Sequence, residues 1–312
     1  MKAILINKVK NYIQHPTILL KIVLNHIAPL IKDDETFIRL KWSLSCMGYP
    51  LNMEHPKTFN EKLQWLKLHD RRPEYTIMVD KVKAKQWVAE RIGKQYIIPT
   101  LGVWEQPEDI DFDQLPNQFV LKCNHNSGDG MFIIKEKSKM DIQQVIKGLR
   151  KGIKQNYFWR NREWPYKDVK PLILAEQYME DEDTKELRDY KFFCFYGVPK
   201  ALFVATDRNC KTEETKFDFY DIELNNLPFT NGHPNSTKNI VIPENYEEMK
   251  AIAAKLSAGF PHVRVDLYSI NGKTYFGEMT LSHWSGMMPF VPEDWDHKFG
   301  EWLKLPESTI VT

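Results

Sequence analysis

The clearest structural signal in the sequence is a pair of alternating runs around Asn-Gly, which reads Val263-Arg-Val-Asp266-Leu-Tyr-Ser-Ile-Asn-Gly272-Lys-Thr-Tyr-Phe-Gly-Glu278-Met-Thr280. Asn-Gly between such runs is a strong signal for a β-hairpin. A two-residue loop would pair Asp266 with Gly277 and turn Glu278 to the other face. A three-residue loop, with Gly272 left-handed in a bulge, would pair Asp266 with Phe276 and keep Glu278 on the same face.

The second of these registers makes Asp266 and Glu278 diagonal neighbours. Two carboxylates on one face repel each other unless a cation lies between them, and hard oxygen ligands suit magnesium. The stretch therefore predicts either a magnesium-binding hairpin or an ordinary hairpin with two solvated acids.

A second stretch delivers a lysine into a small polar loop and reads Phe119-Val-Leu-Lys122-Cys-Asn-His-Asn-Ser-Gly128-Asp-Gly130-Met-Phe-Ile-Ile. The glycines would let backbone N–H groups approach phosphate oxygens, and the lysine supplies a charge for the same anion. It is not a P-loop, because no helix follows directly. Two interpretations remain, a phosphate-binding turn and an ordinary hairpin with a Gly-rich turn.

Two further features are weaker. Asp80-Lys81 opens a predicted helix, where a lysine is either functional or simply solvated. The run Ile173-Leu-Ala-Glu176-Gln-Tyr-Met-Glu180 predicts a buried strand that ends in acids. Such a strand could line an adenine slot and place an acid on the ribose, or it could be an ordinary strand leaving the core.

The remaining pattern predicts an α+β fold with antiparallel sheets, because strands follow one another with only a few helices between them. Residues 1 to about 75 are predicted to be helical, with a capping box formed by Thr58 and Glu61. Residues 207–239 are polar and predict a long loop. The other expected elements are helices at 80–91, 141–156 and 244–257, and strands at 96–104, 119–123, 131–135, 172–177, 190–196, 200–205, 263–270 and 273–280.

Composition indicates a globular chain. Of 312 residues, 42% are hydrophobic and 12% aromatic, which is enough for a packed core. The formal net charge of +1 gives no global field for nucleic acid. The four cysteines form no CxxC pair, so a disulfide framework or zinc site is not expected, and a reducing, cytoplasmic setting is predicted.

The first 32 residues contain five lysines and no acid. Apolar residues recur there at helical spacing, but Lys21 and His26 interrupt them, so we expect neither a transmembrane helix nor, without a small-residue cleavage site, a signal peptide. Two interpretations remain. The segment is either a helix docked on the body of the protein or a basic amphipathic helix at the inner face of an anionic cell membrane.

The order of these features resembles the ATP-grasp superfamily, and within it the TupA-like group named after a teichuronopeptide biosynthesis protein. The resemblance covers most of residues 55–300. It is carried by Thr58-Phe-Asn-Glu-Lys62, Asp80-Lys81, Asp189-Tyr-Lys191, Thr206-Asp-Arg208, Arg264-Val-Asp266 and Phe276-Gly-Glu-Met-Thr280.

The resemblance implies an ATP-grasp-like, two-lobed α+β fold after a helical N-terminal region at residues 1–75. The catalytic domain would span residues 76–312, with a lid lobe at about 115–172 and a C-terminal lobe at about 173–312.

It also implies an ATP site. Lys81 and Lys122 would contact the phosphates, and Glu176, Gln177 and Tyr178 would hold adenine. The mobile phosphate lid would comprise His125, Asn126, Ser127, Gly128 and Gly130. One acid among Glu180, Asp181 and Asp183 would accept the ribose hydroxyls.

Asp266 and Glu278 would hold Mg²⁺, with Thr280 as the third ligand. Most ATP-grasp enzymes have asparagine at the position of Thr280, and a hydroxyl is a poorer ligand than an amide oxygen. Arg264, Arg208 and Lys191 have no obvious acidic partner in the sequence. They are expected either to recognise phosphate or carboxylate or to form surface salt bridges.

The implied activity is that of an ATP-dependent carboxylate–amine ligase acting through an acylphosphate. It would join an amino acid or other amine to a carboxylated sugar in bacterial surface polysaccharide, such as capsule, teichuronopeptide or O-antigen. The alternatives are a sugar kinase, a glycosyltransferase, and a non-catalytic nucleotide-binding module of the assembly complex.

Overall fold

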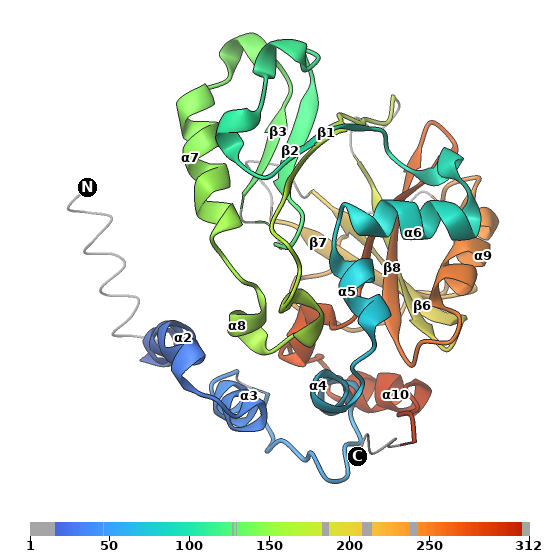
Figure 1. Ribbon diagram of the computed structural model, residues 1–312. Coiled ribbons are helices and arrows are strands. Elements are labelled where there is room, and N and C mark those ends of the chain that lie inside the picture. Colours follow the sequence, from blue (N-terminus) through green and yellow to red (C-terminus); the bar gives the residue numbers. More distant parts are fainter. Residues whose placement is uncertain are drawn as a thin grey trace.

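The computed structural model describes residues 16–45, 47–126, 128, 130–182, 187–207, 214–237 and 242–307 (Figure 1). The described helices are α2 (Pro16–Ile27), α3 (Asp34–Ser43), α4 (Phe59–His69), α5 (Pro73–Val79), α6 (Lys83–Ile92), α7 (Ile142–Ile153), α8 (Phe158–Asn161), α9 (Tyr246–Ser257) and α10 (Asp294–Trp302). The described strands are β1 (Thr100–Trp104), β2 (Phe119–Cys123), β3 (Met131–Ile134), β4 (Ile173–Gln177), β5 (Asp189–Phe195), β6 (Val198–Thr206), β7 (Lys216–Asp221), β8 (Val263–Ile270) and β9 (Lys273–Thr280).

The strands form two antiparallel sheets, one with the order β1-β4-β2-β3 and one with the order β7-β6-β5-β8-β9. The smaller sheet lies at the top of Figure 1 with α7, and the larger sheet lies below it, next to α5, α6 and α9. The prediction of an α+β fold with antiparallel sheets is confirmed.

The larger sheet is covered on both faces, which explains why β5 is buried along its whole length. Phe192 points into a core shared with α5, α6 and α9. Phe193, its neighbour, points into an aromatic core shared with α4 and α10. The expected capping box of α4 is present, because Thr58 and Glu61 each bond the backbone of the other.

The smaller sheet is covered on one face only. Phe119 and Leu121 on that face pack with Val145 and Leu149 of α7. The opposite face carries Lys122 and its cross-strand neighbours, and it faces the larger sheet across the cleft described below.

The β8–β9 hairpin has a register that neither sequence-based alternative anticipated. Asn271 and Gly272 both have positive φ, at 50° and 72°, and Ile270 pairs with Lys273, so the loop has two residues. The register then shifts between Asp266 and Leu267, where Gly277 is the extra residue of a bulge. As a result Asp266 lies directly opposite Glu278.

Gly277 is suited to this bulge because there is no room for a side chain. A Cβ there would lie 3.0 Å from the Asp266 carbonyl oxygen and 3.0 Å from Tyr268 Cε2. Residues 207–239, expected to be one loop, contain strand β7. The alternation of Phe217 and Phe219 with polar residues was hidden by the polar composition of the whole segment.

The N-terminal helices pack on the body through one side. Leu24 and Ala28 are buried against Phe37 of α3. Arg162 donates hydrogen bonds to the carbonyls of Ala28 and Ile31, at 2.8 and 2.7 Å, and pairs with Asp34 at 3.0 Å. Within the described part of the chain, no helix has the length and apolar character needed to cross a membrane.

Candidate active site

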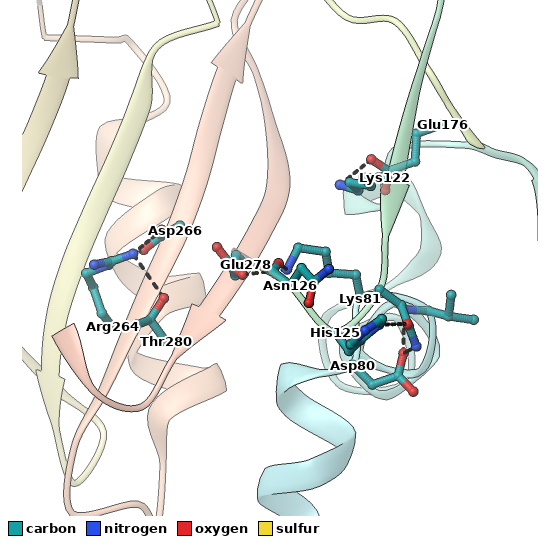
Figure 2. A network of polar contacts seen from close by, with 12 residues as sticks. Asp80, Lys81, Lys122, His125, Asn126, Glu176, Arg264, Asp266, Glu278 and Thr280 are labelled. Atoms are coloured by element: carbon teal, nitrogen blue, oxygen red, sulfur yellow. Dashed lines mark hydrogen bonds and ion pairs between the residues drawn. The ribbon is translucent and has the colours of Figure 1, made fainter. Parts of the chain in front are cut away.

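A cleft between the two sheets gathers charged side chains from three parts of the chain. Lys81 lies in the turn before α6 and Lys85 in the first turn of that helix. Lys122 and Glu176 come from the smaller sheet, and Glu278 comes from β9 of the larger sheet. The free space between them is about 10 Å³, room for about one water molecule. The charged groups themselves fill the cleft, since they pair with one another (Figure 2).

Two sets of ion pairs organise the cleft. Glu176 accepts from Lys85 at 2.6 Å and also from Lys122. Lys81 Nζ lies 2.9 Å from Glu278 Oε1 and 2.8 Å from the Asn126 carbonyl oxygen. Lys81 therefore links the turn after β2 to the larger sheet.

A buried asparagine sets the position of Lys81. Asn124 is fully buried, and its side chain donates to Asp80 Oδ1 at 2.9 Å while it accepts from the Leu172 N–H at 2.8 Å. Its carbonyl accepts from the backbone N–H of Lys81 at 3.1 Å. Asp80 Oδ1 also accepts from the Val82 N–H at 3.0 Å, so the same contacts begin α6.

The face of the smaller sheet that carries Lys122 and Glu176 is otherwise aliphatic. Cross-strand pairing aligns Val103, Leu174, Lys122 and Met131 in one row, and Glu176, Val120 and Ile133 in the next. Val103, Met131 and Ile133 are exposed, although they are large and apolar. An exposed aliphatic surface beside two lysines has the chemistry needed to bury a flat base and bind its phosphates.

A buried polar chain lies beside Glu278 on the larger sheet. Lys191 Nζ contacts Asp266 Oδ2 and lies 2.6 Å from Asp189 Oδ2. Arg264 contacts both oxygens of Asp266, at 2.7 and 2.8 Å, and also Thr280 Oγ1 at 2.9 Å. The positive charges of Lys191 and Arg264 thus balance the negative charges of the buried Asp189 and Asp266.

Arg264 continues this chain to His283 and Asn231. Its Nη1 lies 2.6 Å from His283 Nδ1, and an arginine can only donate, so Nδ1 accepts. His283 Nε2 then carries the proton and donates to Asn231 Oδ1 at 2.8 Å. Burial and the nearby Arg264 charge hold the pKa of His283 well below its usual value, so the ring is neutral.

These contacts engage four of the five N–H groups of Arg264, whose side chain is only 11% exposed. In this arrangement Arg264 orients Asp266 and does not reach into the cleft. Lys191 and Arg264, for which the sequence suggested no acidic partner, therefore share Asp266.

Both carboxylates of the cleft are ionised at neutral pH. Burial of Glu176 opposes its ionisation, but Lys122 and Lys85 together hold its pKa below the usual value. Burial opposes ionisation of Glu278 as well, yet Lys81, with Lys191 and Arg264 further away, lowers its pKa to about 2.

The donors fit a magnesium ion held mainly through Glu278 and phosphate oxygens. Among the described residues, Lys81 alone forms an ion pair or hydrogen bond with the Glu278 carboxylate, and that side chain is 33% exposed. Both Asp266 oxygens are engaged, and Thr280 accepts from Arg264. The described residues contain no group of three His, Cys, Asp or Glu that could hold a metal. Magnesium often keeps several waters and uses only one or two carboxylates.

The other expected site residues in the described part of the chain lie in the turn after β2 and at the end of β4. His125 is buried and bonds the Gln155 carbonyl at 2.9 Å, and Asn126 donates to the Gly152 carbonyl at 2.7 Å, so both tie the turn to α7. Gly128 and Gly130 both have positive φ in this turn. Gln177 ends β4, and the Tyr178 ring lies 5.4 Å from Lys135 Nζ. Three expected residues, Ser127, Asp183 and Arg208, lie outside the described part of the chain.

Sequence reasoning did not identify Lys85, Asp189 and His283 as site residues. The spacing of Lys81 and Lys85 at i, i+4 is a signal for one helix face. Asp189 and Lys191 alternate on one strand face and so could also have been paired. His283 follows β9 with no local pattern that marks it.

The comparisons with known proteins agree with the motifs. A family model described as TupA-like ATPgrasp matches residues 61–304. No curated protein matches the chain.

Similar solved structures share little sequence with the chain. D-cycloserine synthetase DcsG is 15% identical over 74% of this chain and 71% of its own, with a TM-score of 0.44. D-alanine–D-alanine ligase from Helicobacter pylori is 12% identical over 78% and 69%, with a TM-score of 0.43. The ATP-grasp ligase PsnB, solved with a precursor variant, Mg and ADP, is 9% identical over 68% of this chain, with a TM-score of 0.40. The match spans about half of the PsnB chain, 52%.

These structural likenesses are too weak to carry an argument. The family match, in contrast, covers most of the chain and both sheets. The chain therefore belongs to the TupA-like ATP-grasp family.

Proposed function

We propose that the protein is an ATP-dependent carboxylate–amine ligase. The observation that carries this proposal is the convergence of Lys81, Lys85 and Lys122 with Glu278 in one cleft, beside an exposed aliphatic sheet face. Three ammonium groups suit the phosphates of ATP, and the aliphatic face suits its base.

The proposed reaction has two steps. A carboxylate oxygen of the acceptor attacks the γ-phosphorus of ATP, the bond to the bridging oxygen breaks, and ADP leaves with the electron pair. An amine nitrogen then attacks the acyl carbon of the acylphosphate and loses one proton, while inorganic phosphate leaves with the electrons of the broken C–O bond. No covalent enzyme intermediate is needed, so the chain supplies positioning and charge.

Each site residue would have a role that follows from its position. Lys81 and Lys122 would bind phosphate oxygens. When Lys122 leaves Glu176 to bind the nucleotide, Lys85 would remain as the ion-pair partner of Glu176. Magnesium, held by Glu278 and Asp266, would neutralise phosphate charge. Lys191 and Arg264 would orient Asp266, and Arg208 would recognise the acceptor carboxylate or the acylphosphate.

We propose that the acceptor is a carboxylated sugar of a bacterial surface polysaccharide and that the amine is an amino acid or a related compound. Membership of the TupA-like family supports this choice. Such a glycan is built on a lipid carrier at the inner face of the membrane, so we also propose a cytoplasmic enzyme with peripheral membrane contact through residues 1–32.

Calorimetric titration with Mg-ATP tests the nucleotide site. Lys122→Ala and Glu278→Gln should each weaken binding about ten- to hundredfold, because each removes one charge-assisted contact. Lys139→Ala, which removes a 77% exposed lysine of the same lobe, is the matched control and should bind as wild type. Equal affinity of all three variants would reject the site.

A second assay separates the possible reactions. Hydroxylamine attacks an acylphosphate and leaves a hydroxamate, so a ligase should form one in the presence of ATP and a sugar acid. Phosphate transfer to a sugar hydroxyl, with no hydroxamate, would identify a kinase. Binding of a nucleotide sugar instead of ATP would identify a glycosyltransferase. A non-catalytic module would show no turnover, and Asp266→Asn would change only complex assembly.

A further inference from the structure

Helix α2 exposes an apolar stripe. Leu19, Val23 and Ile27 follow at intervals of four residues, and Leu20 lies beside them. All four side chains are between 41% and 52% exposed, and Leu30, just after the helix, is 78% exposed. Spacing of three and four residues places them along one face of the helix. An exposed patch of this kind marks an interaction surface.

The stripe is not the side of α2 that packs against the rest of the protein. Leu24 and Ala28, on the adjacent face, are buried against Phe37. Arg162, itself fully buried, holds the end of the helix through the Ala28 carbonyl. The helix is thus anchored on one side and leaves the stripe uncovered on the other.

The charge around the stripe favours one kind of partner. Residues 1–32 contain five lysines and no acid, and Lys21 and Lys32 lie in the described part. Asp33, Asp34 and Glu35 follow at the start of α3, so the basic character belongs to residues 1–32 themselves. Apolar side chains on a basic helical segment are typical of helices that lie on anionic bilayers.

We propose that the stripe formed by Leu19, Leu20, Val23, Ile27 and Leu30 is a docking surface for an anionic lipid bilayer. The apolar side chains would enter the interface between headgroups and acyl chains, and the lysines would contact lipid phosphates. This inference gives the proposed membrane contact a defined surface, and it can be tested without knowledge of the reaction.

Vesicle sedimentation of the full chain tests the surface. Wild type should bind vesicles of phosphatidylglycerol and phosphatidylcholine, and binding to phosphatidylcholine alone should be at least about tenfold weaker. Leu19→Asp/Val23→Asp should lose at least about tenfold in binding, because two exposed aliphatic groups that would enter the bilayer are replaced by charges. Ile142→Asp is the matched control, since Ile142 is a 43% exposed aliphatic residue at the start of α7 and distant in sequence from α2.

Folding and charge are checked separately. Lys21→Gln/Lys32→Gln should weaken binding and reduce its salt dependence without touching the stripe. Each variant should bind Mg-ATP as wild type, so a failed fold or a failed nucleotide site is distinguished from a failed membrane surface. Equal binding of wild type and the double Asp variant to vesicles would overturn the proposal. Self-association that the Asp variant abolishes, without vesicle binding, would replace it with an interface between copies.

Discussion

Replacement of Gly277 by alanine should disturb the end of the β8–β9 hairpin that carries Asp266 and Glu278. The new Cβ would lie 3.0 Å from the Asp266 carbonyl oxygen, 0.4 Å short of the 3.4 Å at which contact becomes ordinary. The Tyr268 ring, also at 3.0 Å, can move aside, but the carbonyl belongs to the backbone of β8. Relief therefore requires the bulge itself to shift, at a cost of about 1–3 kcal/mol in the free energy of unfolding.

The shift would also reach the cleft, because Glu278 follows Gly277 directly and pairs with Lys81 at 2.9 Å. We expect Gly277→Ala to bind Mg-ATP about tenfold more weakly, which corresponds to about 1.4 kcal/mol. Urea unfolding measures the stability and calorimetric titration measures the affinity. Gly272→Asn is the control in the same hairpin, because its Cβ would meet nothing within 4 Å and asparagine tolerates the positive φ of 72°.

A Gly277→Ala variant with the wild-type urea midpoint and the wild-type affinity for Mg-ATP would contradict both expectations. The bulge would then not be what keeps Glu278 opposite Asp266. A loss of stability with unchanged Mg-ATP affinity would support the steric clash at Gly277 but would show that the clash does not affect nucleotide binding.

Three further predictions follow from the ion pairs and hydrogen bonds. Lys81→Met should lower the free energy of unfolding at pH 7, because it leaves the Glu278 carboxylate without its paired cation. The difference in urea midpoint between variant and wild type should shrink as the pH falls from the usual glutamate pKa of 4.5 toward about 2, because a protonated Glu278 has no charge for Lys81 to stabilise. A constant difference across that range would contradict this assignment. Glu176→Gln should destabilise by about 1–3 kcal/mol, since Lys85 and Lys122 lose their shared partner, and adding Lys85→Ala should recover part of the loss in thermal unfolding. His283→Leu should destabilise by about 1–3 kcal/mol at pH 8 by leaving an Arg264 N–H unpaired. The loss should be smaller at pH 5, because His283 stays neutral in the folded protein but takes up a proton in the unfolded chain below its usual pKa of 6.5, a cost that the leucine variant avoids.

The sequence predicted the strands of this protein where local pattern alone decides them. Phe119–Cys123, Val263–Ile270 and Lys273–Thr280 begin and end where expected, since polar or glycine residues flank each apolar run. The helix expected from Asp80 begins at Lys83, after a turn in which Asp80 Oδ1 accepts hydrogen bonds from the N–H groups of Val82 and Lys83. Strand β7 was missed because a polar segment surrounds its two phenylalanines.

The site was predictable only as a set of residues. The family resemblance brought Lys81, Lys122, Glu176 and Glu278 to one candidate site, and the structure places them around one cleft. Their pairing was not predictable, because the position of Glu278 depends on a bulge that arises from contacts between strands. Asp266, one partner of Arg264, lies two residues away on the same strand, but Thr280 and His283 come from β9 and the turn after it, which no local pattern connects to Arg264.

Because ion pairs fill the cleft, the proposed binding of a nucleotide would be an exchange between competing anions. Three ammonium groups face two carboxylates, so the excess is a single positive charge. A small monovalent anion must displace a carboxylate already held nearby and gains little by doing so. A triphosphate offers several charges on one molecule and brings magnesium to compensate the released carboxylate. In the proposed nucleotide site, the cleft would thus select against chloride before any shape is tested, and its selectivity would depend on the acids as much as on the lysines.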